Sequence, residues 1–225
     1  MAHPAPDPIR AIVNSYDSPI IRAYSRLRFT VLRQIFLEEI EQYLPTTGRI
    51  LDVACGFGLF SLYFASLEPG RKLVGIDVDR RRIQHARMSA ARLGVHNVEY
   101  HVADALRWSD EGSFDAIYLL DLIHHLPRHE VPAFLTKLRE RLPEGGILIA
   151  KEVEDRPAWK RWFTLLLDRL MVGMKPIHYW PAPELAAVLE GLDLQVVKHR
   201  MRDVLPYPHI LYVSRVPQRD GPPRR

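Results

Sequence analysis

Cysteine is nearly absent from this sequence, since Cys55 is the single one among 225 residues. An internal disulfide is therefore excluded, and a lone cysteine fits a reducing compartment. An excess of charge of one sign is also missing, because 31 Lys and Arg stand against 27 Asp and Glu, a formal net charge of +4. So mild an excess does not by itself indicate nucleic-acid binding, for which basic residues usually gather on one face.

Long hydrophobic runs are missing as well. The first ten residues, MAHPAPDPIR, contain three prolines and lack the apolar stretch of a signal peptide. The most apolar window, residues 162–174, is interrupted by Asp168 and Arg169 and is too short to cross a bilayer. The sequence therefore predicts a cytoplasmic protein, with contact to the inner face of a membrane as a further hypothesis considered below.

What is present is a regular alternation of strand-like and helix-like segments. Strands are expected at 49–53, 72–77, 97–104, 114–120, 147–153, 194–200 and 209–215, and helices at 59–67, 79–94, 130–142, 158–174 and 183–190. Such alternation is typical of a parallel sheet covered by helices on both faces. The prediction is a doubly wound, mostly parallel, seven-stranded Rossmann-like α/β sheet.

The segments suggest one domain with two additions. Proline-rich, polar ends predict a loose segment at 1–17 and a disordered tail at 216–225. Between them we expect a single domain over 18–215. Its parts are a helical cap (18–47), a cofactor-binding core (48–153), a substrate-side helical insertion (157–190) and two closing strands (191–215).

The loop after the first core strand, DVACGFG (52–58), has the small residues of a nucleotide-binding turn. A dinucleotide fingerprint needs G-x-G-x-x-G, but Gly56 and Gly58 are followed by Ser61 where the third glycine belongs. A phosphate loop needs G-K-[ST], which this stretch lacks. The remaining pattern is an acid, Asp52, followed by small residues at 54, 56 and 58.

Two further acids end the next two strands. Asp77, 21 residues past Gly56, is placed to accept hydrogen bonds from a ribose diol, and Asp104 is placed to accept from an adenine amino group. Together with the PEGG turn at 143–146, this order and spacing resembles that of class I S-adenosylmethionine-dependent methyltransferases. The resemblance covers roughly residues 48–153, and any one of its motifs alone would be weak.

The resemblance implies the donor and the residues that bind it. The donor is S-adenosyl-L-methionine, and the product is S-adenosyl-L-homocysteine. The cofactor-binding set implied is Asp52, Ala54, Cys55, Gly56, Gly58, Asp77, Val78, Asp104, Ala105 and Asp121.

Ala54 departs from the glycine that the family has at this position. Because alanine adopts only φ < 0 comfortably, we expect a turn of ordinary handedness here, with any loss of affinity no more than about tenfold. The neighbouring Cys55 is expected to be a small, buried, inert residue rather than a nucleophile, since no base is fixed beside it by sequence.

By resemblance, the acceptor binds beyond the fourth strand, at DLIHHL (121–126). Methyl transfer needs a base only if the acceptor is a hydroxyl, a protonated amine or an acidic carbon. Asp121, His124 and His125 are the candidate bases. Alternatively, one histidine packs against the cofactor and the other faces water. A metal site that adds His129 matches no standard ligand spacing, so no metal is predicted.

The cap and the insertion bear on the acceptor. Residues 14–28 resemble the N-terminal lid of small-molecule and lipid-quinone methyltransferases, with Tyr16 and then Tyr24 as the aromatic that helps to cover the cofactor. Tyr16 therefore joins the candidate catalytic set. Residues 158–180 are apolar and aromatic with interspersed basic residues. This segment is interpreted as a roof over an apolar site or a homodimer face, or else as a peripheral membrane contact.

The sequence therefore predicts an enzyme that moves a methyl group to a small, hydrophobic or lipid-like acceptor by in-line displacement. Methyltransferases of base amines and glutamine amides carry an Asn/Asp-Pro-Pro-aromatic turn after the fourth strand, which DLIHHL replaces here. A nucleic-acid partner is thus not expected. An RNA or protein methyltransferase and a non-catalytic S-adenosylmethionine-binding subunit remain as alternatives.

Overall fold

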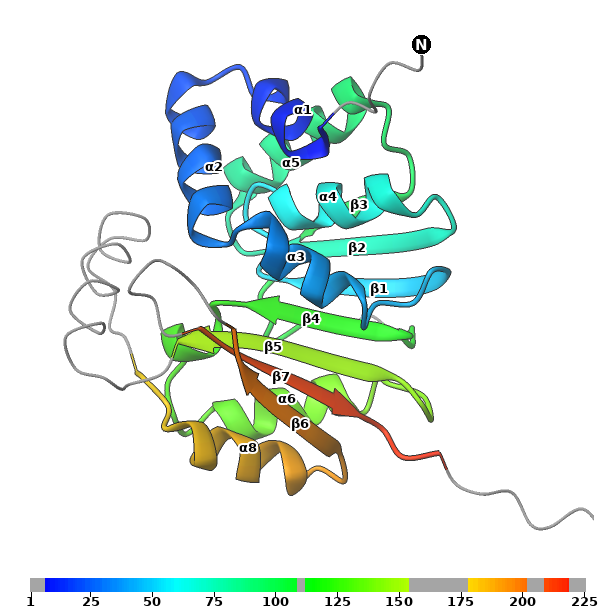
Figure 1. Ribbon diagram of the computed structural model, residues 1–225, viewed down its shortest axis with the longest axis vertical. Coiled ribbons are helices and arrows are strands. Elements are labelled where there is room, and N and C mark those ends of the chain that lie inside the picture. The colour runs from blue at the N-terminus through cyan, green and yellow to red at the C-terminus, as the bar shows by residue number, and fades with distance from the viewer. Residues whose placement is uncertain (1–6, 109–111, 154–177, 202–208, 219–225) are drawn as a thin grey trace, which may run out of the picture. The chain divides into compact units, whose positions relative to one another are not determined.

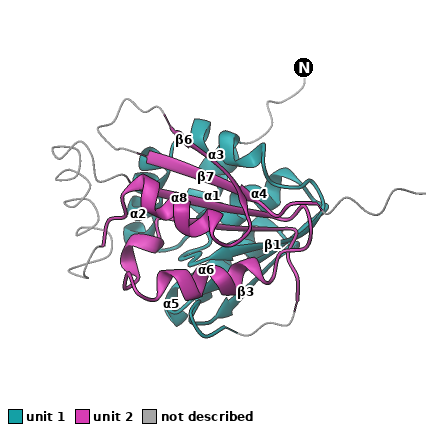
Figure 2. Cartoon of the chain, turned by 90° about the horizontal axis from the view of Figure 1, so that it is seen from below, with its two compact units in different colours: residues 1–109 teal, residues 110–225 magenta. Residues whose placement is uncertain are grey.

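The computed structural model describes residues 7–108, 112–153, 178–201 and 209–218. Contacts between Cα atoms divide the chain into two compact units, Met1–Ser109 and Asp110–Arg225 (Figure 2). Each unit is described by itself. The single domain expected over 18–215 stays a prediction.

Unit 1 contains three parallel strands in the order β3-β2-β1. Pairing of β1 with β2 ends at Val53 and Ile76, and pairing of β2 with β3 ends at Asp77 and Val102. The carboxyl ends of all three strands therefore lie at one edge of this part of the sheet. The strands and their connecting helices are β1 (Gly48–Val53), α4 (Leu59–Leu67), β2 (Arg71–Asp77), α5 (Arg80–Leu93) and β3 (Val98–Val102).

Helix α5 begins and ends where its sequence requires. The Asp79 carboxylate accepts hydrogen bonds from the backbone N–H groups of Arg81 (2.8 Å) and Arg82 (3.2 Å), which caps the N-terminus. Gly94 ends the helix in the left-handed conformation, with φ 65°. These local signals explain why the predicted helix at 79–94 is observed with almost the same bounds.

Three helices precede the sheet: α1 (Pro8–Ser15), α2 (Pro19–Val31) and α3 (Gln34–Glu41) (Figure 1). The predicted loose segment at 1–17 is wrong for its described part. Asp7 caps α1 by accepting from Ile9 N at 3.0 Å, and Ile12 and Val13 are buried where α1 contacts α4 and α5. The burial of this short apolar stripe outweighs the prolines that made the segment look unstructured.

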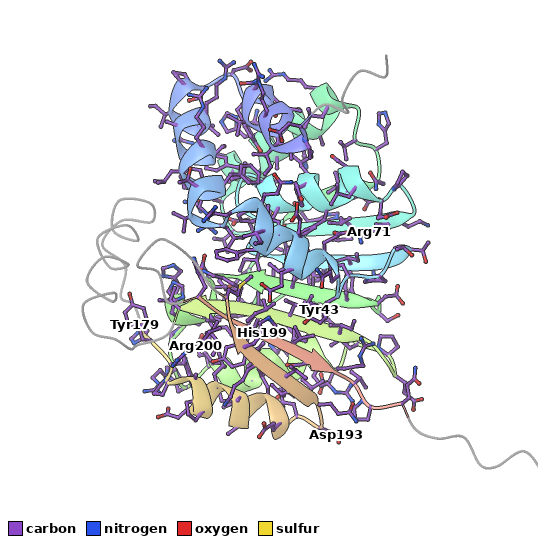
Figure 3. All side chains as sticks on the ribbon, viewed as in Figure 1. Tyr43, Arg71, Tyr179, Asp193, His199 and Arg200 are labelled. Atoms are coloured by element: carbon purple, nitrogen blue, oxygen red, sulfur yellow. The ribbon has the colours of Figure 1, made fainter. Side chains whose placement is uncertain are left out.

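Arg71, labelled in Figure 3, fixes the end of α3 on the start of β2. Its side chain is 1% exposed and makes two hydrogen bonds to the Glu41 carboxylate, at 2.8 and 2.6 Å. Its Nε also donates to the Pro45 carbonyl at 2.7 Å. Because a buried guanidinium needs such compensation, losing Glu41 would cost about 3–5 kcal/mol of unfolding free energy.

Unit 2 contains four strands in the order β4-β5-β7-β6. Strands β4 and β5 are parallel, whereas β7 is antiparallel to both β5 and β6. Its elements are β4 (Ala116–Leu120), the 3₁₀ helix η1 (Ile123–His125), α6 (Val131–Arg139), β5 (Ile147–Val153), α8 (Ala182–Glu190), β6 (Gln195–Arg200) and β7 (His209–Arg215).

The predicted mostly parallel, seven-stranded α/β fold is confirmed, with β7 as the strand of opposite direction. The disordered tail expected at 216–225 is wrong at its start, because Val216 is buried and pairs with Gly146 and Gly145 through backbone hydrogen bonds of 2.9 and 3.1 Å. The helix expected at 158–174 lies outside the described residues. Within the described ranges, no helix is long and apolar enough to cross a membrane.

Candidate functional site

The loop that follows β1 takes a conformation that the sequence did not lead us to expect. Ala54 has φ 61°, and Gly56 and Gly58 have φ 57° and 77°. The expectation of φ < 0 at Ala54 is therefore wrong. Three alternate residues must be left-handed for the loop to fold back at the end of β1, and a Cβ in that conformation costs about 1–2 kcal/mol.

Backbone hydrogen bonds and one carboxylate hold this loop against β2. Cys55 N donates to the Ile76 carbonyl and Gly58 N donates to the Cys55 carbonyl, both at 2.9 Å. Gly56 N donates to Oδ2 of Asp77, also at 2.9 Å. The acid at the end of β2 thus shapes the loop after β1 besides being the expected ribose ligand.

Asp77 also has the surroundings that a ribose ligand needs. It is 6% exposed, and its Oδ1 accepts from Asp79 N at 2.8 Å, so each oxygen uses one lone pair and keeps another. A Cβ built on Gly56 would meet no atom within 4 Å. The next residue, Val78, is 64% exposed, as an apolar contact for a flat base would be. These residues fit the nucleoside part of S-adenosylmethionine.

Tyr100, on β3, packs against the loop after β1 and was not predicted as a site residue. A Cβ on Gly58 would come within 2.5 Å of the Tyr100 Oη. Ser61 replaces the third glycine of a dinucleotide fingerprint, and its Oγ lies 3.1 Å from the same Oη. Burial raises the pKa of Tyr100, so this hydroxyl stays protonated. No sequence signal distinguishes this tyrosine from an ordinary core residue.

Cys55 is buried, as expected, and its lack of reactivity stays a prediction. Its side chain is buried, and burial, together with the negative charges of Asp52 and Asp77, raises the pKa of its thiol well above the usual range. A thiol held in its neutral form is a poor nucleophile. Cys55 therefore contributes its backbone and its small volume to the loop.

The two outer acids of the predicted set lie on either side of Asp77. Asp52 is 3% exposed on β1, in register with Gly75 of β2. Asp104 and Ala105 follow β3, and Ala103 N donates to the Asp77 carbonyl at 3.0 Å, which ties this segment to the end of β2. Asp104 itself is half-exposed, and its Oδ1 accepts from the Leu106 N–H at 2.9 Å.

Tyr16 contacts the loop through its phenol group. It is 2% exposed, and its hydroxyl donates to the Phe57 carbonyl at 2.8 Å. Burial raises the pKa of Tyr16, so the phenol keeps its proton near neutral pH and cannot act as a base there. Tyr24 packs edge-on against the Phe57 ring, with centroids 5.3 Å apart. The role of either tyrosine in covering the cofactor stays a prediction.

The backbone around Tyr16 is fixed by two arginines. Arg92 Nη1 donates to the Ser15 carbonyl at 2.6 Å and its Nη2 pairs with Asp17. Arg22 Nε donates to the Tyr16 carbonyl at 2.6 Å. The end of α1 is thereby attached to α5 and, through the Tyr16 hydroxyl, to the loop after β1.

In unit 2, Asp121 follows β4 and also has φ 61°. Its N–H donates to the Lys151 carbonyl at 2.9 Å, and the Lys151 ammonium donates to its Oδ1. Lys151 lies on β5 with its side chain 0% exposed. A carboxylate that balances a buried ammonium is a poor candidate base, because protonating it would leave that charge uncompensated.

His124 lies in η1 and is held by a glutamate that the sequence reasoning missed. Its Nδ1 is 2.5 Å from Oε2 of Glu152, and the two side chains are 2% and 6% exposed. The other oxygen of Glu152 accepts from the backbone N–H groups of Leu122 (3.1 Å) and Ile123 (2.8 Å). The available signal was the position of Glu152 near the carboxyl end of β5.

Aromatic residues before α8 lie next to His124. His178 N donates to the His124 carbonyl at 2.7 Å, and the Tyr179 ring is nearly parallel to the imidazole, with centroids 6.1 Å apart. Tyr179 is labelled in Figure 3. The His125 ring centroid is 4.2 Å from that of His124. Among the described residues, no group of three or more His, Cys, Asp or Glu is arranged to hold a metal ion.

Comparisons with known sequences agree with this geometry. Residues 50–146 match a family model described as a methyltransferase domain. A ubiquinone biosynthesis O-methyltransferase of Cereibacter sphaeroides is 32% identical over 125 residues, which cover 54% of this chain and 48% of that protein. The chain thus spans about half the length of the curated relatives it matches. The predicted resemblance to class I methyltransferases is confirmed.

Solved structures share the fold at low sequence identity. Magnesium protoporphyrin IX methyltransferase from Synechocystis, with bound SAH, has a TM-score of 0.67 and 16% identity, over 93% of this chain and 100% of that chain. The cyclase SpnF also has a TM-score of 0.67, with 17% identity, over 81% of each chain. At such identities the likeness shows the fold alone, and the second structure shows that this fold occurs in a protein named for another reaction.

Proposed function

We propose that this chain transfers the methyl group of S-adenosyl-L-methionine to a small, hydrophobic acceptor, leaving S-adenosyl-L-homocysteine. The observation that carries the proposal is the placement of Asp77 at the end of β2, where its carboxylate accepts from the N–H of Gly56, a glycine whose Cβ position has no atom within 4 Å. The family match over residues 50–146 supports the same donor.

The donor side is assigned to residues of unit 1. Asp77 would accept from the ribose hydroxyls, Val78 would contact the adenine, and Gly56 leaves room for the nucleoside. When bound, S-adenosyl-L-methionine supplies a methyl group on a sulfonium, which is an excellent leaving group. Most of the acceleration then comes from holding the acceptor in line with the methyl group and from excluding water.

The hydrophobic acceptor rests on the aromatic residues before α8. Tyr179 and Trp180 are partly exposed, and Trp180 lies under the Arg128 guanidinium at 4.5 Å from its ring centroid. The relative from Cereibacter sphaeroides is named for ubiquinone biosynthesis, and ubiquinone is an apolar molecule. Contact of residues 158–180 with a membrane and homodimer formation stay predictions, because 158–177 lie outside the described residues.

Calorimetric titration tests the donor assignment. Wild type should bind S-adenosyl-L-methionine with a dissociation constant on the order of micromolar. Asp77→Asn should bind about 100-fold more weakly, because two hydrogen bonds to a charged acceptor are weakened. Asp193→Asn is the matched control, since Asp193 is exposed, has φ 57°, and Asn tolerates that conformation. Unchanged binding by Asp77→Asn would contradict the assignment.

Incubation with radiolabelled S-adenosyl-L-methionine locates the acceptor. Lipid extract, total RNA and protein lysate should each be offered, and we expect the label in the lipid fraction. Label in RNA or protein alone would favour the alternative methyltransferases. Binding of the donor without label in any fraction would favour the non-catalytic subunit.

A further inference from the structure

The pair formed by His124 and Glu152 is the feature of unit 2 that the proposed function leaves unexplained. Both side chains are almost completely buried, and burying an imidazole and a carboxylate together is costly for a protein. Replacement by apolar residues of similar size would serve stability at least as well. A buried ionisable pair in the segment where the acceptor is expected to bind is therefore a candidate functional group.

Two backbone N–H groups and the imidazole of His124 converge on the Glu152 carboxyl group, which bears on the tautomer of the histidine. Oε1 accepts from Leu122 N and Ile123 N, and Oε2 faces Nδ1 of His124. In its carboxylate form Glu152 can only accept a hydrogen bond from the imidazole. The proton of a neutral His124 therefore lies on Nδ1, and the lone pair lies on Nε2 at the opposite side of the ring.

The imidazole is also fixed in place. Glu152 holds the two residues before it through their backbone, and His178 N holds the His124 carbonyl. The partly exposed Tyr179 ring lies nearly parallel to the imidazole. Rigid orientation by a carboxylate is what a histidine needs to accept a proton efficiently at a defined position.

The other predicted candidates are less suited to this task. Asp121 balances the buried Lys151 ammonium, and the buried Tyr16 phenol keeps its proton while bonded to Phe57. Of the two histidines in the predicted catalytic set, His124 is the one that a buried carboxylate orients, and His125 is its neighbour.

From this geometry we infer that His124 is the general base of the reaction, that Glu152 is its positioning residue, and that the acceptor atom is a hydroxyl oxygen. This inference rests on the proposed function. An uncharged amine needs no base, whereas a hydroxyl, a protonated amine or an acidic carbon must lose a proton. Among these three we commit to the hydroxyl, because the relative from Cereibacter sphaeroides is named an O-methyltransferase. The oxygen forms the bond to the methyl carbon, the carbon–sulfur bond breaks with its electron pair passing to sulfur, and the hydroxyl proton passes to Nε2.

The test compares wild type, Glu152→Gln, His124→Gln and the control His129→Gln, whose side chain is 83% exposed. With labelled S-adenosyl-L-methionine and lipid extract, kcat should fall about 10–100-fold in Glu152→Gln and about 100-fold or more in His124→Gln, with KM nearly unchanged. Because the imidazolium then lacks its negative partner, the acidic limb of the kcat profile should move to lower pH in Glu152→Gln.

The product and the free protein give independent readouts. Label in the product should be released as methyl iodide by hydriodic acid, as from an ether, and label retained as N-methyl or C-methyl would overturn the inference. Nitrogen NMR of the free protein should show the Nδ1–H tautomer for the resonance lost in His124→Gln. The opposite tautomer, or variants that melt earlier yet keep the wild-type pH profile, would show a structural pair only. Absence of label in every fraction with wild type would instead contradict the proposed function.

Discussion

The loop after β1 in unit 1 and the loop after β4 in unit 2 are built in similar ways. Each contains a non-glycine residue with φ 61°, Ala54 in one and Asp121 in the other. Each has one backbone N–H bonded to a carbonyl of the neighbouring strand, Ile76 or Lys151. In each, a carboxylate near the end of that strand accepts further backbone N–H groups, Asp77 in one case and Glu152 in the other.

The two loops differ in what the remaining polar groups do. In unit 1, the left-handed residue has no polar side chain, and the carboxylate of Asp77 keeps lone pairs beside an open glycine. In unit 2, the left-handed residue pairs with a buried lysine, and the second oxygen of Glu152 holds an imidazole. The same backbone arrangement therefore occurs at the proposed donor site in unit 1 and at the histidine of unit 2.

The largest effect should come from Asp121→Gly. Glycine suits φ 61°, but the substitution leaves the Lys151 ammonium buried without its carboxylate, which should lower the free energy of unfolding by about 3–5 kcal/mol. Urea denaturation measures this loss. Asp121→Asn, which tolerates the backbone but lacks the charge, should lose almost as much, and a stable Asn variant would show that the ion pair is not what holds the loop.

Gly58→Ala should have the next largest effect. The added Cβ would lie 2.5 Å from the Tyr100 Oη at φ 77°, so overpacking and backbone strain together should cost about 2–4 kcal/mol. Gly56→Ala is the matched control, because its Cβ would meet nothing within 4 Å and only strain of about 1–2 kcal/mol remains. Equal thermal shifts for the two variants would mean that Tyr100 does not support the loop.

Ala54→Gly should change stability in the direction opposite to Asp121→Gly. Relief of left-handed strain, about 1–2 kcal/mol, exceeds the added entropy of the unfolded chain, about 0.5–1 kcal/mol. The variant should gain about 0.5–1 kcal/mol in urea denaturation and keep its affinity for S-adenosyl-L-methionine. A loss of stability would indicate that the left-handed conformation of Ala54 carries no strain.

The smallest effect concerns pH and Cys55. Burial raises the pKa of this thiol well above its usual range, so at alkaline pH the folded state keeps a proton that the unfolded state releases. Titration of Cys55 therefore leaves the free energy of unfolding unchanged below pH 9 and should lower it as pH rises above that value. Cys55→Ser should remove the part of the stability loss at alkaline pH that the thiol causes. In the native protein, iodoacetamide should not react with Cys55 at neutral pH, and rapid labelling would contradict its burial.

Much of the fold followed from the sequence because its signals are local. The bounds of α5, the acid that ends β2 and the acid that follows β3 could be predicted from residue type and spacing. The helix α1 was missed because its stability comes from contacts with α4 and α5, which are distant in the chain. The same reason explains why local composition suggested a loose end.

Site residues could be predicted from the sequence where a side chain directly follows one strand. They were harder to predict where the site depends on the pairing of two strands. Asp77 was predicted from one strand end, whereas the pairing of His124 with Glu152 needs β4 and β5 to be neighbours in register. The conformation of Ala54 was predicted with the wrong sign because residue propensity was weighed without the loop's hydrogen bonds to β2. Long-range pairing, not propensity, decides such positions.

A crystal structure of the protein with S-adenosyl-L-homocysteine tests the central claim most directly. We expect both ribose hydroxyls to lie within hydrogen-bond distance of the Asp77 carboxylate, Gly56 N to keep its bond to Oδ2, and Val78 to contact the adenine. A ligand bound with its ribose away from Asp77, or a crystal grown with saturating ligand in which this loop stays empty, would contradict it.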